Sequence, residues 1–441
     1  MKNILLRGGR RLTGTLGIHG AKNAILPILS ASLLAEEPVI LNNCPRLLDI
    51  DNMLEILRRL GCRAEQEGDR IYIDSSDADG YRIDEQLSRR LRASLFILGP
   101  LIGRFGKALL SYPGGCDIGM RPIDLHLAAL ERMGAVIRED HGALDCTVPM
   151  GRLHGAEIVL SFPSVGATQN VLIAAVLAEG RTILRGAAQE PEIDDLIRFL
   201  NGAGARIRQD FAGTLIVDGV DSLHAVRHRV IPDRIAAATY LCCAAAAGGS
   251  ITVEGCVPAH LAAVLPPLEQ AGCRVRTWRD AVAITVPKRL GSLGWVRTMP
   301  YPGFPTDAQA PLMAAALKAD GTTVFTETIF QNRYRHVNEM TRMGARVRTE
   351  GKVAIVTGVP RLHGASVRCT DLRGGAALCA AALAAEGQSV IAEIHHIERG
   401  YEHLDESLRQ LGANITRSDH ETEAEETQTE QPTTSEEGAG A

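Results

Sequence analysis

The sequence predicts an α/β fold built from six copies of one unit, which divide into two domains of three copies each. Three observations lead to this prediction: a motif recurs six times, helices without a polar face recur in each copy, and the composition supplies a large core. Hydrophobic residues make up 45% of the 441 residues, whereas aromatic residues make up only 4%. Small and aliphatic side chains must therefore fill the interior.

The recurring motif is a helix end, a glycine followed by a small residue, and an alternating strand. Its marker glycines are Gly61, Gly134, Gly204, Gly272, Gly344 and Gly412. They are 68 to 73 residues apart. Glycine suits this place because it adopts the left-handed conformation at a helix end without a Cβ penalty. The polar and apolar alternation that follows predicts a strand with one buried face.

A second landmark lies upstream in each unit, where an alanine- and leucine-rich stretch ends in a turn and a β-branched strand. Residues 236–247 are apolar on nearly every side, which indicates a helix buried in a core. Each unit thus reads as strand, helix, strand, helix, strand, strand (βαβαββ). We expect helices enclosed by sheets, an inside-out α/β barrel.

Six units exceed one ordinary core, so two domains are expected, with a ligand site between them. The first three marker glycines belong to one domain and the last three to the other. Residues 421–441 differ, because they hold seven glutamates and no lysine, arginine or aromatic residue. This stretch predicts a solvated, disordered tail. The formal net charge of −5 is due to it, since residues 1–420 carry +2.

Several classes of protein are excluded by what the sequence lacks. The N-terminus has no apolar stretch of signal-peptide length, and the apolar run 235–247 is too short to span a bilayer. Ten cysteines in such a chain indicate reduced thiols in a cytoplasmic protein. No Cys-x-x-Cys pair, His-Glu-x-x-His motif or P-loop is present, so we expect no metal site and no membrane insertion. The charge balance also argues against a nucleic-acid partner.

Polar or charged residues stand at the expected starts of all six buried helices. They are Lys22 and Asn23, Arg92, Ser164 with Val165 and Gly166, Asp233 and Arg234, Thr306 and Asp307, and Arg373. Helix N-termini offer unpaired N–H groups and a positive dipole end, so converging starts predict an anion site. Capping by Ser164, Thr306 or Asp307 is the alternative. Capping explains Lys22, Arg92 and Arg373 poorly, because a cation opposes the dipole there and needs an anionic partner.

A glycine-flanked loop carries Cys116, five residues before Arg121. Glycines let the backbone approach a ligand, and a nearby cation lowers the pKa of a thiol toward the reactive range. A structural loop cysteine is the alternative. Arg333 and Arg399 add cations in later units, for which an exposed surface position is the alternative.

At these residues the sequence resembles the enolpyruvyl transferases, over residues 1 to about 419. The segments that carry the resemblance are 20–24, 113–116, 121–126, 164–168, 232–234, 304–307, 327–328, 332–333, 371–373 and 396–402. The resemblance implies two inside-out α/β barrels of three units each, with the first strand in the C-terminal domain. The domains expected on this basis are 22–229, 1–21 plus 230–419, and the tail 420–441.

The resemblance also implies a reaction. Enolpyruvyl would pass from phosphoenolpyruvate to the 3-hydroxyl of UDP-N-acetylglucosamine with release of phosphate, the first committed step of peptidoglycan synthesis, without a cofactor. Both substrates are strongly anionic, which suits a cluster of arginine forks and a lysine.

The resemblance assigns roles to single residues. Cys116 would protonate the enol carbon, form a thioether adduct with phosphoenolpyruvate and be alkylated by the epoxide fosfomycin. Asp307 would take the proton of the sugar hydroxyl, and Lys22 would steady the developing charge. The residues expected to hold phosphoenolpyruvate are Lys22, Asn23, Arg121, Arg373 and Arg399. The residues expected at the UDP-sugar are Arg92, Arg121, Pro122, Ile123, Asp124, Leu125, Ser164, Val165, Gly166, Asp307 and Ile329.

Two alternatives remain. One is transfer to shikimate 3-phosphate, which the cysteine loop and segment 121–126 disfavour. The other is a catalytically silent paralogue that binds the UDP-sugar. Gly374 and Gly375 are its only hint, because the family usually has alanine and serine there, and the change puts in doubt how firmly Arg373 is held.

Overall fold

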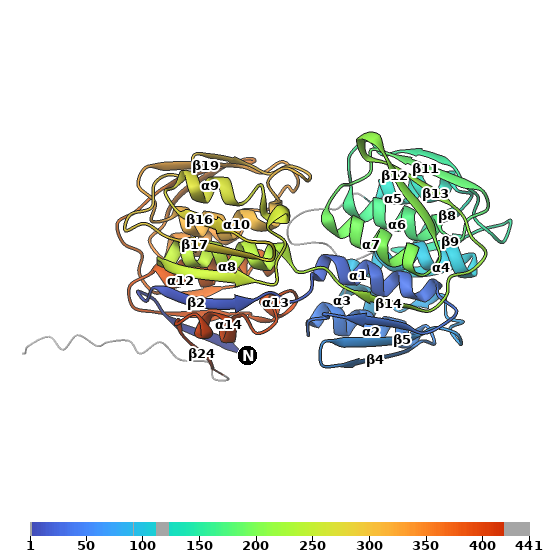
Figure 1. The fold of residues 1–441 in the computed structure, drawn as a ribbon, viewed down its shortest axis with the longest axis horizontal. Helices are drawn as coiled ribbons and strands as arrows, with labels where there is room; N and C mark the ends of the chain where they lie inside the picture. Colours follow the sequence, from blue (N-terminus) through green and yellow to red (C-terminus); the bar gives the residue numbers. More distant parts are fainter. Residues whose placement is uncertain (1, 91, 112–122, 419–441) are drawn as a thin grey trace, which may run out of the picture.

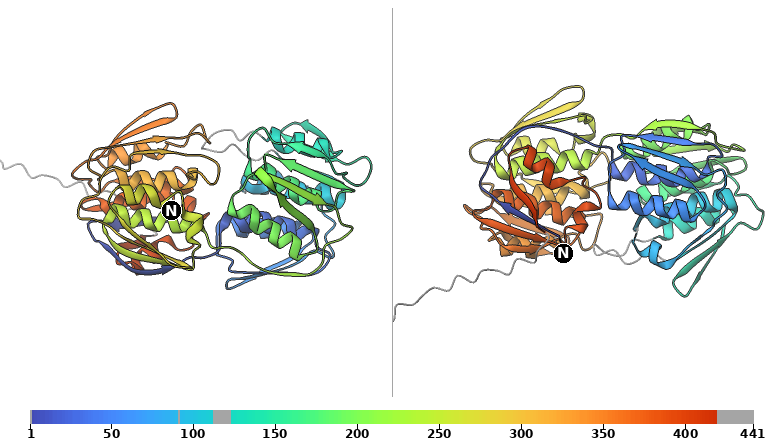
Figure 2. Two further views of the ribbon diagram at one scale, coloured as in Figure 1. Left: turned by 45° about the horizontal axis from the view of Figure 1, so that its top comes forward. Right: turned by 90° about the horizontal axis from the view of Figure 1, so that it is seen from below.

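The computed structural model describes residues 2–90, 92–111 and 123–418, which form two lobes (Figure 1). Each lobe has its own hydrophobic core. The core of lobe 1 draws on residues between Ala21 and Val230, and that of lobe 2 on residues 4–18 and 236–415. The lobes stay side by side in both further views (Figure 2). We propose the boundaries 22–229 and 1–21 plus 230–419, since the cores divide the chain there; the tail 420–441 lies outside the described residues.

The described residues contain six four-stranded sheets of one pattern, in which the third strand of each unit lies at an edge. Lobe 1 has the sheets β14 (Val226–Arg229), β3 (Val39–Asn42), β5 (Arg70–Asp74), β4 (Arg63–Glu67); β6 (Arg82–Ile83), β7 (Lys107–Ser111), β9 (Ala143–Thr147), β8 (Val136–Asp140); and β10 (Glu157–Val159), β11 (Arg181–Arg185), β13 (Thr214–Asp218), β12 (Arg206–Asp210). The first two strands of each sheet are parallel, and the remaining pairs are antiparallel.

Lobe 2 repeats this pattern. Its sheets are β2 (Leu12–Gly17), β15 (Gly249–Glu254), β17 (Ala281–Thr285), β16 (Arg274–Thr277); β18 (Trp295–Arg297), β19 (Thr322–Thr326), β21 (Val353–Thr357), β20 (Arg346–Glu350); and β22 (Ser366–Arg368), β23 (Gln388–Ala392), β1 (Asn3–Arg7), β24 (Asn414–Ser418). The predicted βαβαββ unit is thus present six times.

The two lobes exchange strands. β2 comes just before the first helix of lobe 1 in sequence, yet it pairs in parallel with β15 of lobe 2. β14 leads toward lobe 2 but pairs in parallel with β3 of lobe 1. β1 inserts between β23 and β24, where it completes the sixth unit. The chain therefore crosses between the lobes twice, as the resemblance implied.

The helices of lobe 1 are α1 (Lys22–Ala31), η1 (Ser32–Leu34), α2 (Leu48–Arg59), α3 (Glu85–Arg90), η2 (Arg92–Ile97), α4 (Leu98–Phe105), α5 (Asp124–Arg132), α6 (Val165–Ala175), α7 (Pro191–Gly202) and η3 (Phe211–Gly213). Those of lobe 2 are α8 (Arg234–Ala247), η4 (Pro258–Leu261), α9 (Leu265–Gln270), α10 (Thr306–Ala316), α11 (His336–Arg342), α12 (Leu372–Ala384), α13 (His395–Glu398) and α14 (Leu404–Gln410).

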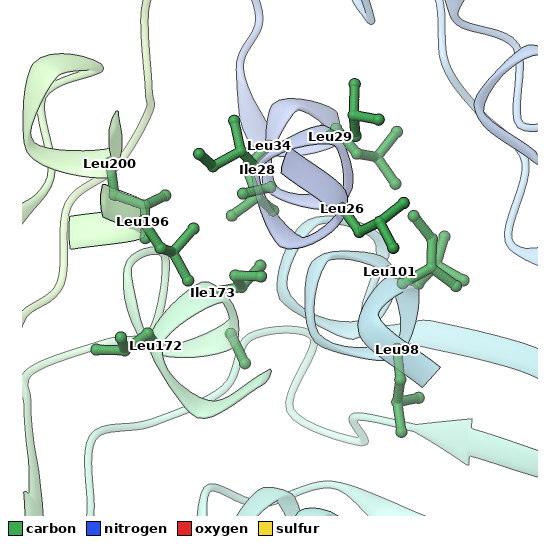
Figure 3. Close-up of a cluster of buried hydrophobic side chains, with 14 of the residues drawn as sticks. Leu26, Ile28, Leu29, Leu34, Leu98, Leu101, Leu172, Ile173, Leu196 and Leu200 are labelled. Carbon is green, nitrogen blue, oxygen red and sulfur yellow. The ribbon is translucent and has the colours of Figure 1, made fainter. Parts of the chain in front are cut away.

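One helix of each unit is enclosed. In α8 every residue from Ile235 to Ala246 is buried, and its small side chains let α10 and α12 pack against it. Sheets lie outside these helices (Figure 1). In lobe 1, leucine and isoleucine side chains of α1, α4, α6 and α7 meet in the same way (Figure 3). The predicted inside-out arrangement is confirmed, with the helices enclosed by six four-stranded sheets in the described part of the chain.

The marker glycines end helices as predicted. All six have positive φ, from 87° at Gly344 to 104° at Gly204, a conformation that costs glycine little. The edge strands that follow expose arginines, such as Arg274 and Arg276 of β16 and Arg346 and Arg348 of β20. Charged side chains on an edge strand oppose sheet-to-sheet association.

Candidate active site at the lobe boundary

The starts of α1 and α8 meet where the chain crosses between the lobes. Asp233 caps α8 by accepting from the backbone N–H groups of Ile235 and Ala236, at 2.8 and 2.9 Å. Its other oxygen accepts from the backbone N–H of Lys22, at 3.2 Å. One carboxylate thus satisfies donors at two helix starts from different lobes, and this fixes Lys22 at the boundary.

Lys22 and Arg399 share the carboxylate of Asp49. Lys22 Nζ lies 2.6 Å from Asp49 Oδ2, and Arg399 donates from Nε to Oδ1 at 2.8 Å and from Nη2 to Oδ2 at 3.2 Å. Lys22 and Asp49 belong to lobe 1, whereas Arg399 follows α13 in lobe 2. We call these three residues the Asp49 triad. It joins the lobes through charge-assisted hydrogen bonds.

A second carboxylate, Asp307 in the first turn of α10, is likewise held by two cations. Arg333 Nη2 donates to Oδ1 at 2.9 Å, and Arg373 donates to Oδ2 from Nη2 at 3.0 Å and from Nε at 3.2 Å. We call Arg333, Asp307 and Arg373 the Asp307 triad. Asn23 of lobe 1 donates from Nδ2 to Asp307 at 3.5 Å, so this triad also reaches across the boundary.

These contacts shift the protonation of the acidic and basic groups. Burial alone would raise the pKa of Asp307, but Arg373 and Arg333 outweigh it and hold the pKa well below its usual range. Burial lowers the pKa of Lys22, Arg399 and Arg373 lower it further, and Asp49 opposes them. The groups therefore behave as one coupled network of four cations and two carboxylates.

Two of these helix-start cations, Lys22 and Arg373, have anionic partners, as expected, but those partners are aspartates of the protein itself. Within the Asp307 triad two buried donors, Arg333 Nε and Arg373 Nη1, have no hydrogen-bond partner among the described residues. Buried guanidinium N–H groups without a partner can bind a further anion, such as a substrate phosphate or carboxylate.

Arg373 is held more firmly than its glycine neighbours suggested. Asp371 caps α12 by accepting from the backbone N–H groups of Arg373 and Gly374, each at 3.0 Å. The side chain of Arg373 is only 3% exposed. A Cβ on Gly374 would lie 2.8 Å from Asp371 Oδ2, and one on Gly375 2.9 Å from Cys369 Sγ. The doubt about Arg373 was therefore wrong: the aspartate supplies the cap, and close packing fills the space around both glycines.

The capping alternative for Thr306 and Asp307 was also wrong. The N-cap of α10 is Pro305, without a side-chain cap, because Thr306 Oγ1 donates to Glu327 at 2.9 Å and Asp307 binds arginines. Glu327 also accepts from the backbone N–H of Ile329 at 2.8 Å. This glutamate sets Ile329 beside the start of α10. Ser164, in contrast, does cap α6, accepting from Ala167 N–H at 3.3 Å.

The remaining described candidates lie at the starts of α5 and α6 in lobe 1. Asp124 is exposed and Leu125 half-buried at the start of α5, and buried Ile123 precedes them. Val165 and Gly166 open α6, where a Cβ on Gly166 would lie 2.9 Å from the ring of His126. Gly166 thus lets α5 and α6 approach closely. Among the described residues, no hydrogen bond or ion pair joins these residues to either triad.

Four predicted residues cannot be placed. Cys116, Arg121 and Pro122 lie outside the described residues, and so does the side chain of Arg92, whose backbone begins η2. The other nine cysteines are buried and free. Burial raises the pKa of the Cys44 and Cys62 thiols to about 12, which fits structural rather than reactive thiols.

Sequence reasoning missed Asp49. It noted Arg333 as a cation with a surface position as the alternative and assigned it no role; the side chain is only 3% exposed, which excludes the surface alternative. Asp49 resembled an ordinary acidic residue in a first helical turn, like exposed Asp51 two positions later. The helical period gave a signal, because Asp49 shares the buried stripe of α2 with Met53, Ile56 and Leu57. A charged residue on an apolar stripe needs a buried partner.

Further contacts fix the lobes relative to each other. Arg234 of α8 forms a bidentate pair with Glu192 of α7, at 2.9 and 3.1 Å, with both side chains less than a tenth exposed. Glu190 accepts from the backbone N–H of Tyr301 at 3.3 Å. Among the residues that the structure describes there is no group of three or more possible metal ligands and no helix suited to crossing a membrane.

Comparison with curated proteins gives relatives along almost the whole chain. UDP-N-acetylglucosamine 1-carboxyvinyltransferase 1 of Symbiobacterium thermophilum is 49% identical over 421 residues, which are 94% of this chain and 95% of that protein. UDP-N-acetylglucosamine 1-carboxyvinyltransferase 2 of Caldanaerobacter subterraneus subsp. tengcongensis is 46% identical over 417 residues, 95% of this chain and all of that protein.

Solved structures share the fold. The enolpyruvyl transferase NikO from Streptomyces tendae superimposes with a TM-score of 0.85 at 28% identity, over 95% of this chain and 99% of that one. EPSP synthase from Acinetobacter baumannii gives 0.70 at 19% identity over the same shares, which concerns the fold alone. The model of the family EPSP synthase (3-phosphoshikimate 1-carboxyvinyltransferase) matches residues 6–408. The chain therefore belongs to the EPSP synthase family and, within it, groups with the UDP-N-acetylglucosamine 1-carboxyvinyltransferases.

Proposed function

We propose that the protein is an enzyme that transfers the enolpyruvyl (1-carboxyvinyl) group from phosphoenolpyruvate to the 3-hydroxyl of UDP-N-acetylglucosamine and releases phosphate. The observation that carries this proposal is the meeting of four cations, Lys22, Arg333, Arg373 and Arg399, around two carboxylates at the lobe boundary. Phosphoenolpyruvate brings a phosphate and a carboxylate to the same three-carbon unit. Rigid arginine forks and a lysine recognise such groups.

The reaction requires one proton to leave the sugar hydroxyl and one to reach the enol. The hydroxyl oxygen bonds to the carbon that bears the phosphate ester, while the methylene carbon takes a proton. The adduct then loses phosphate from the first carbon and a proton from the second, which restores the double bond. Asp307 is the proposed acceptor of the hydroxyl proton, and Cys116 the proposed donor to the enol carbon.

Asp307 needs help to act as a base. A carboxylate whose pKa is held low by two arginines accepts a proton poorly. If Arg333 or Arg373 turns toward a substrate anion, that hold weakens and the pKa of Asp307 rises. Binding of phosphoenolpyruvate would thus prepare the base for the sugar hydroxyl. Asn23, at 3.5 Å from Asp307, is placed to keep the carboxylate oriented.

We propose that UDP-N-acetylglucosamine binds at the starts of α5 and α6 in lobe 1, with Ile329 of lobe 2. Ser164, Val165, Gly166 and Ile123 to Leu125 would supply backbone groups and side chains there, and Arg92, Arg121 and Pro122 come from the resemblance alone. Phosphoenolpyruvate would contact Lys22, Asn23, Arg121, Arg373 and Arg399. The location we infer is the cytoplasm, in support of peptidoglycan synthesis.

A comparison of acceptors tests the function. Phosphate release from phosphoenolpyruvate is measured with UDP-N-acetylglucosamine and, separately, with shikimate 3-phosphate. Release with the UDP-sugar alone supports the proposal. Release with shikimate 3-phosphate alone would assign the other family activity, and binding of the UDP-sugar without release by either acceptor would indicate a silent paralogue.

A covalent test addresses Cys116. Intact-protein mass spectrometry with fosfomycin and the UDP-sugar should give one adduct, which a Cys116→Ser variant lacks. A Cys116→Asp variant should remain active and resist fosfomycin, because a carboxylic acid can also supply the proton. Full activity of Cys116→Ser, or no adduct on the wild type, contradicts the assignment.

A further inference from the structure

We propose that Asp49 is a positioning residue of this enzyme, the counter-ion that holds Lys22 and Arg399 together at the phosphoenolpyruvate site. The proposal deepens the proposed function and rests on it. Asp49 is assigned no direct contact with a substrate; its effect on the reaction passes through the two cations.

The geometry of the Asp49 triad supports this role. The carboxylate is 2% exposed and uses both oxygens, one for Arg399 alone and one for Arg399 and Lys22 together. Arg399 is only 15% exposed and Lys22 10% exposed. Asp49 lies on α2 of lobe 1, and Arg399 follows α13 of lobe 2. The carboxylate therefore also fixes the distance between Lys22 and Arg399 across the boundary.

Backbone and packing direct Lys22 toward Asp49. The backbone N–H of Lys22 is tied to Asp233, so the side chain leaves α1 from a fixed point. A Cβ on Gly400 would lie 3.2 Å from Lys22 Cδ and 2.6 Å from Leu372 Cδ2, so glycine leaves the room in which the lysine stem passes. Arg399 therefore supplies the guanidinium group, and Gly400 leaves room for the side chain of Lys22.

Charge explains why the lysine needs this partner. The charged groups around Lys22 are Asp49 of α2, Arg399 beyond α13, Arg373 of α12, Asp233 at the start of α8 and Asp307 of α10. Burial and the two arginines lower the pKa of Lys22, and the contact with Asp49 opposes them. Removal of this carboxylate would leave a buried ammonium facing two guanidinium groups, which favours loss of its proton.

A purely structural ion pair is the competing account, because a salt bridge across two lobes also stabilises the fold. The two accounts differ in their pH dependence. If Asp49 only stabilises the lobes, its removal lowers stability and leaves the pH profile of the surviving activity in place. If it keeps Lys22 charged, its removal moves the alkaline limb of kcat/KM for phosphoenolpyruvate to lower pH.

The experiment compares Asp49→Asn, Asp49→Glu and wild type, with Asp51→Asn as the matched control. Asparagine keeps the shape of the aspartate side chain and removes its negative charge. Glutamate keeps the carboxylate charge on a longer side chain. Asp51 lies two positions after Asp49 in the first turn of α2 and is exposed. Its replacement by asparagine removes the same carboxylate charge. For each protein KM for phosphoenolpyruvate, KM for UDP-N-acetylglucosamine and the pH profile are measured, and circular dichroism reports folding.

For Asp49→Asn we expect KM for phosphoenolpyruvate to rise at least about tenfold and the alkaline limb to move down by about one pH unit. KM for the UDP-sugar should change less than about threefold. Asp49→Glu should return the limb to its wild-type position, and Asp51→Asn should match the wild type. An unmoved limb in Asp49→Asn, equal changes in both KM values, or no rescue by Glu would overturn the proposal. Turnover by the wild type in the same assay separates these outcomes from failure of the proposed function.

Discussion

Arg373 donates both Nε and Nη2 to one oxygen of Asp307, at 3.2 and 3.0 Å, while Arg333 holds the other oxygen at 2.9 Å. The proposed base is therefore bound by the same arginines that suit the substrate anions. We propose that this arrangement couples the two substrates, because an anion that draws an arginine away makes the carboxylate more basic.

Replacement of Asp307 by asparagine removes the proposed base and keeps its shape. We expect kcat to fall by about 10²- to 10⁴-fold, the usual contribution of a positioned acid or base. Asp320→Asn, at an exposed site of the same lobe, should leave kcat unchanged. Steady-state kinetics check this, and wild-type turnover by Asp307→Asn would remove Asp307 from the mechanism.

Replacement of Arg373 by lysine keeps the charge and loses the fork. A lysine cannot make the two contacts to Asp307 that Nε and Nη2 make, so KM for phosphoenolpyruvate should rise about 10- to 100-fold. The change should also weaken the hold on Asp307 and raise its pKa, which moves the acidic limb of the kcat profile to higher pH. An acidic limb at its wild-type position would show that Arg373 does not control the base.

Gly375, two residues after Arg373, should not tolerate the serine that the family pattern usually has at this position. A Cβ there would lie 2.8 Å from Ile397 Cγ1 and 2.9 Å from Cys369 Sγ, so Gly375→Ser should lower the free energy of unfolding by about 1–3 kcal/mol. The double variant with Cys369→Ala should be less destabilised than the sum of the single changes. Gly17→Ser, where nothing lies within 4 Å of the new Cβ, is the control. Denaturant unfolding that gives additive effects would contradict the packing argument.

His336 should make the protein sensitive to mild acid. Burial lowers the pKa of this histidine from 6.5 to about 4, an effect that nearby Asp371 opposes and Arg333 supports. Because the unfolded chain binds more protons between these values, stability present at pH 7 is lost as the pH falls from 6.5 to 4. The loss due to His336 is about 3 kcal/mol at pH 4.

Denaturant unfolding at pH 7 and pH 4 measures this effect. His336→Gln should lose about 3 kcal/mol less than the wild type on acidification, whereas exposed His154→Gln should lose as much as the wild type. Equal acid sensitivity in all three proteins would show that His336 is not the source.

The buried pair of Glu192 and Arg234 offers a test of the lobe boundary. Removal of one partner leaves an uncompensated buried charge, which typically lowers the free energy of unfolding by about 3–5 kcal/mol. This is a large fraction of the stability of a typical protein. Glu192→Gln and Arg234→Met should each destabilise the protein, and the double variant should cost less than their sum. Thermal unfolding of the four proteins checks the cycle, and additivity would mean that the two side chains do not interact.

The fold could be predicted from the sequence because its strongest signals are local and repeated. The marker glycines report helix ends, and the alanine-rich stretches such as 236–247 report enclosed helices, so the unit follows from periodicity. The exchange of β2 and β14 between the lobes has no local signal. Both strands satisfy the same pattern in either lobe, so only the resemblance indicated it.

The site could be predicted in part. Lys22 and Arg373 were found because cations oppose a helix start, and Arg399 was noted as a further cation whose role came from the resemblance. Asp49 escaped because an acidic residue in a first turn satisfies the dipole without any further partner. Arg333 was noted as a cation but given no partner, since nothing in the sequence shows that it contacts Asp307. Long-range pairing of charges depends on how two units meet, and helical or strand period does not report that.

An isotope label on the enolpyruvyl group follows the transfer from phosphoenolpyruvate to the sugar directly. The wild type is incubated with UDP-N-acetylglucosamine and phosphoenolpyruvate labelled with carbon-13, and the product is read by NMR. We expect the label in a vinyl ether whose carbon couples to the proton at position 3 of the sugar, with one phosphate released for each ether formed. Label found only in free pyruvate, or an ether on any other acceptor in place of this one, would contradict the proposed transfer.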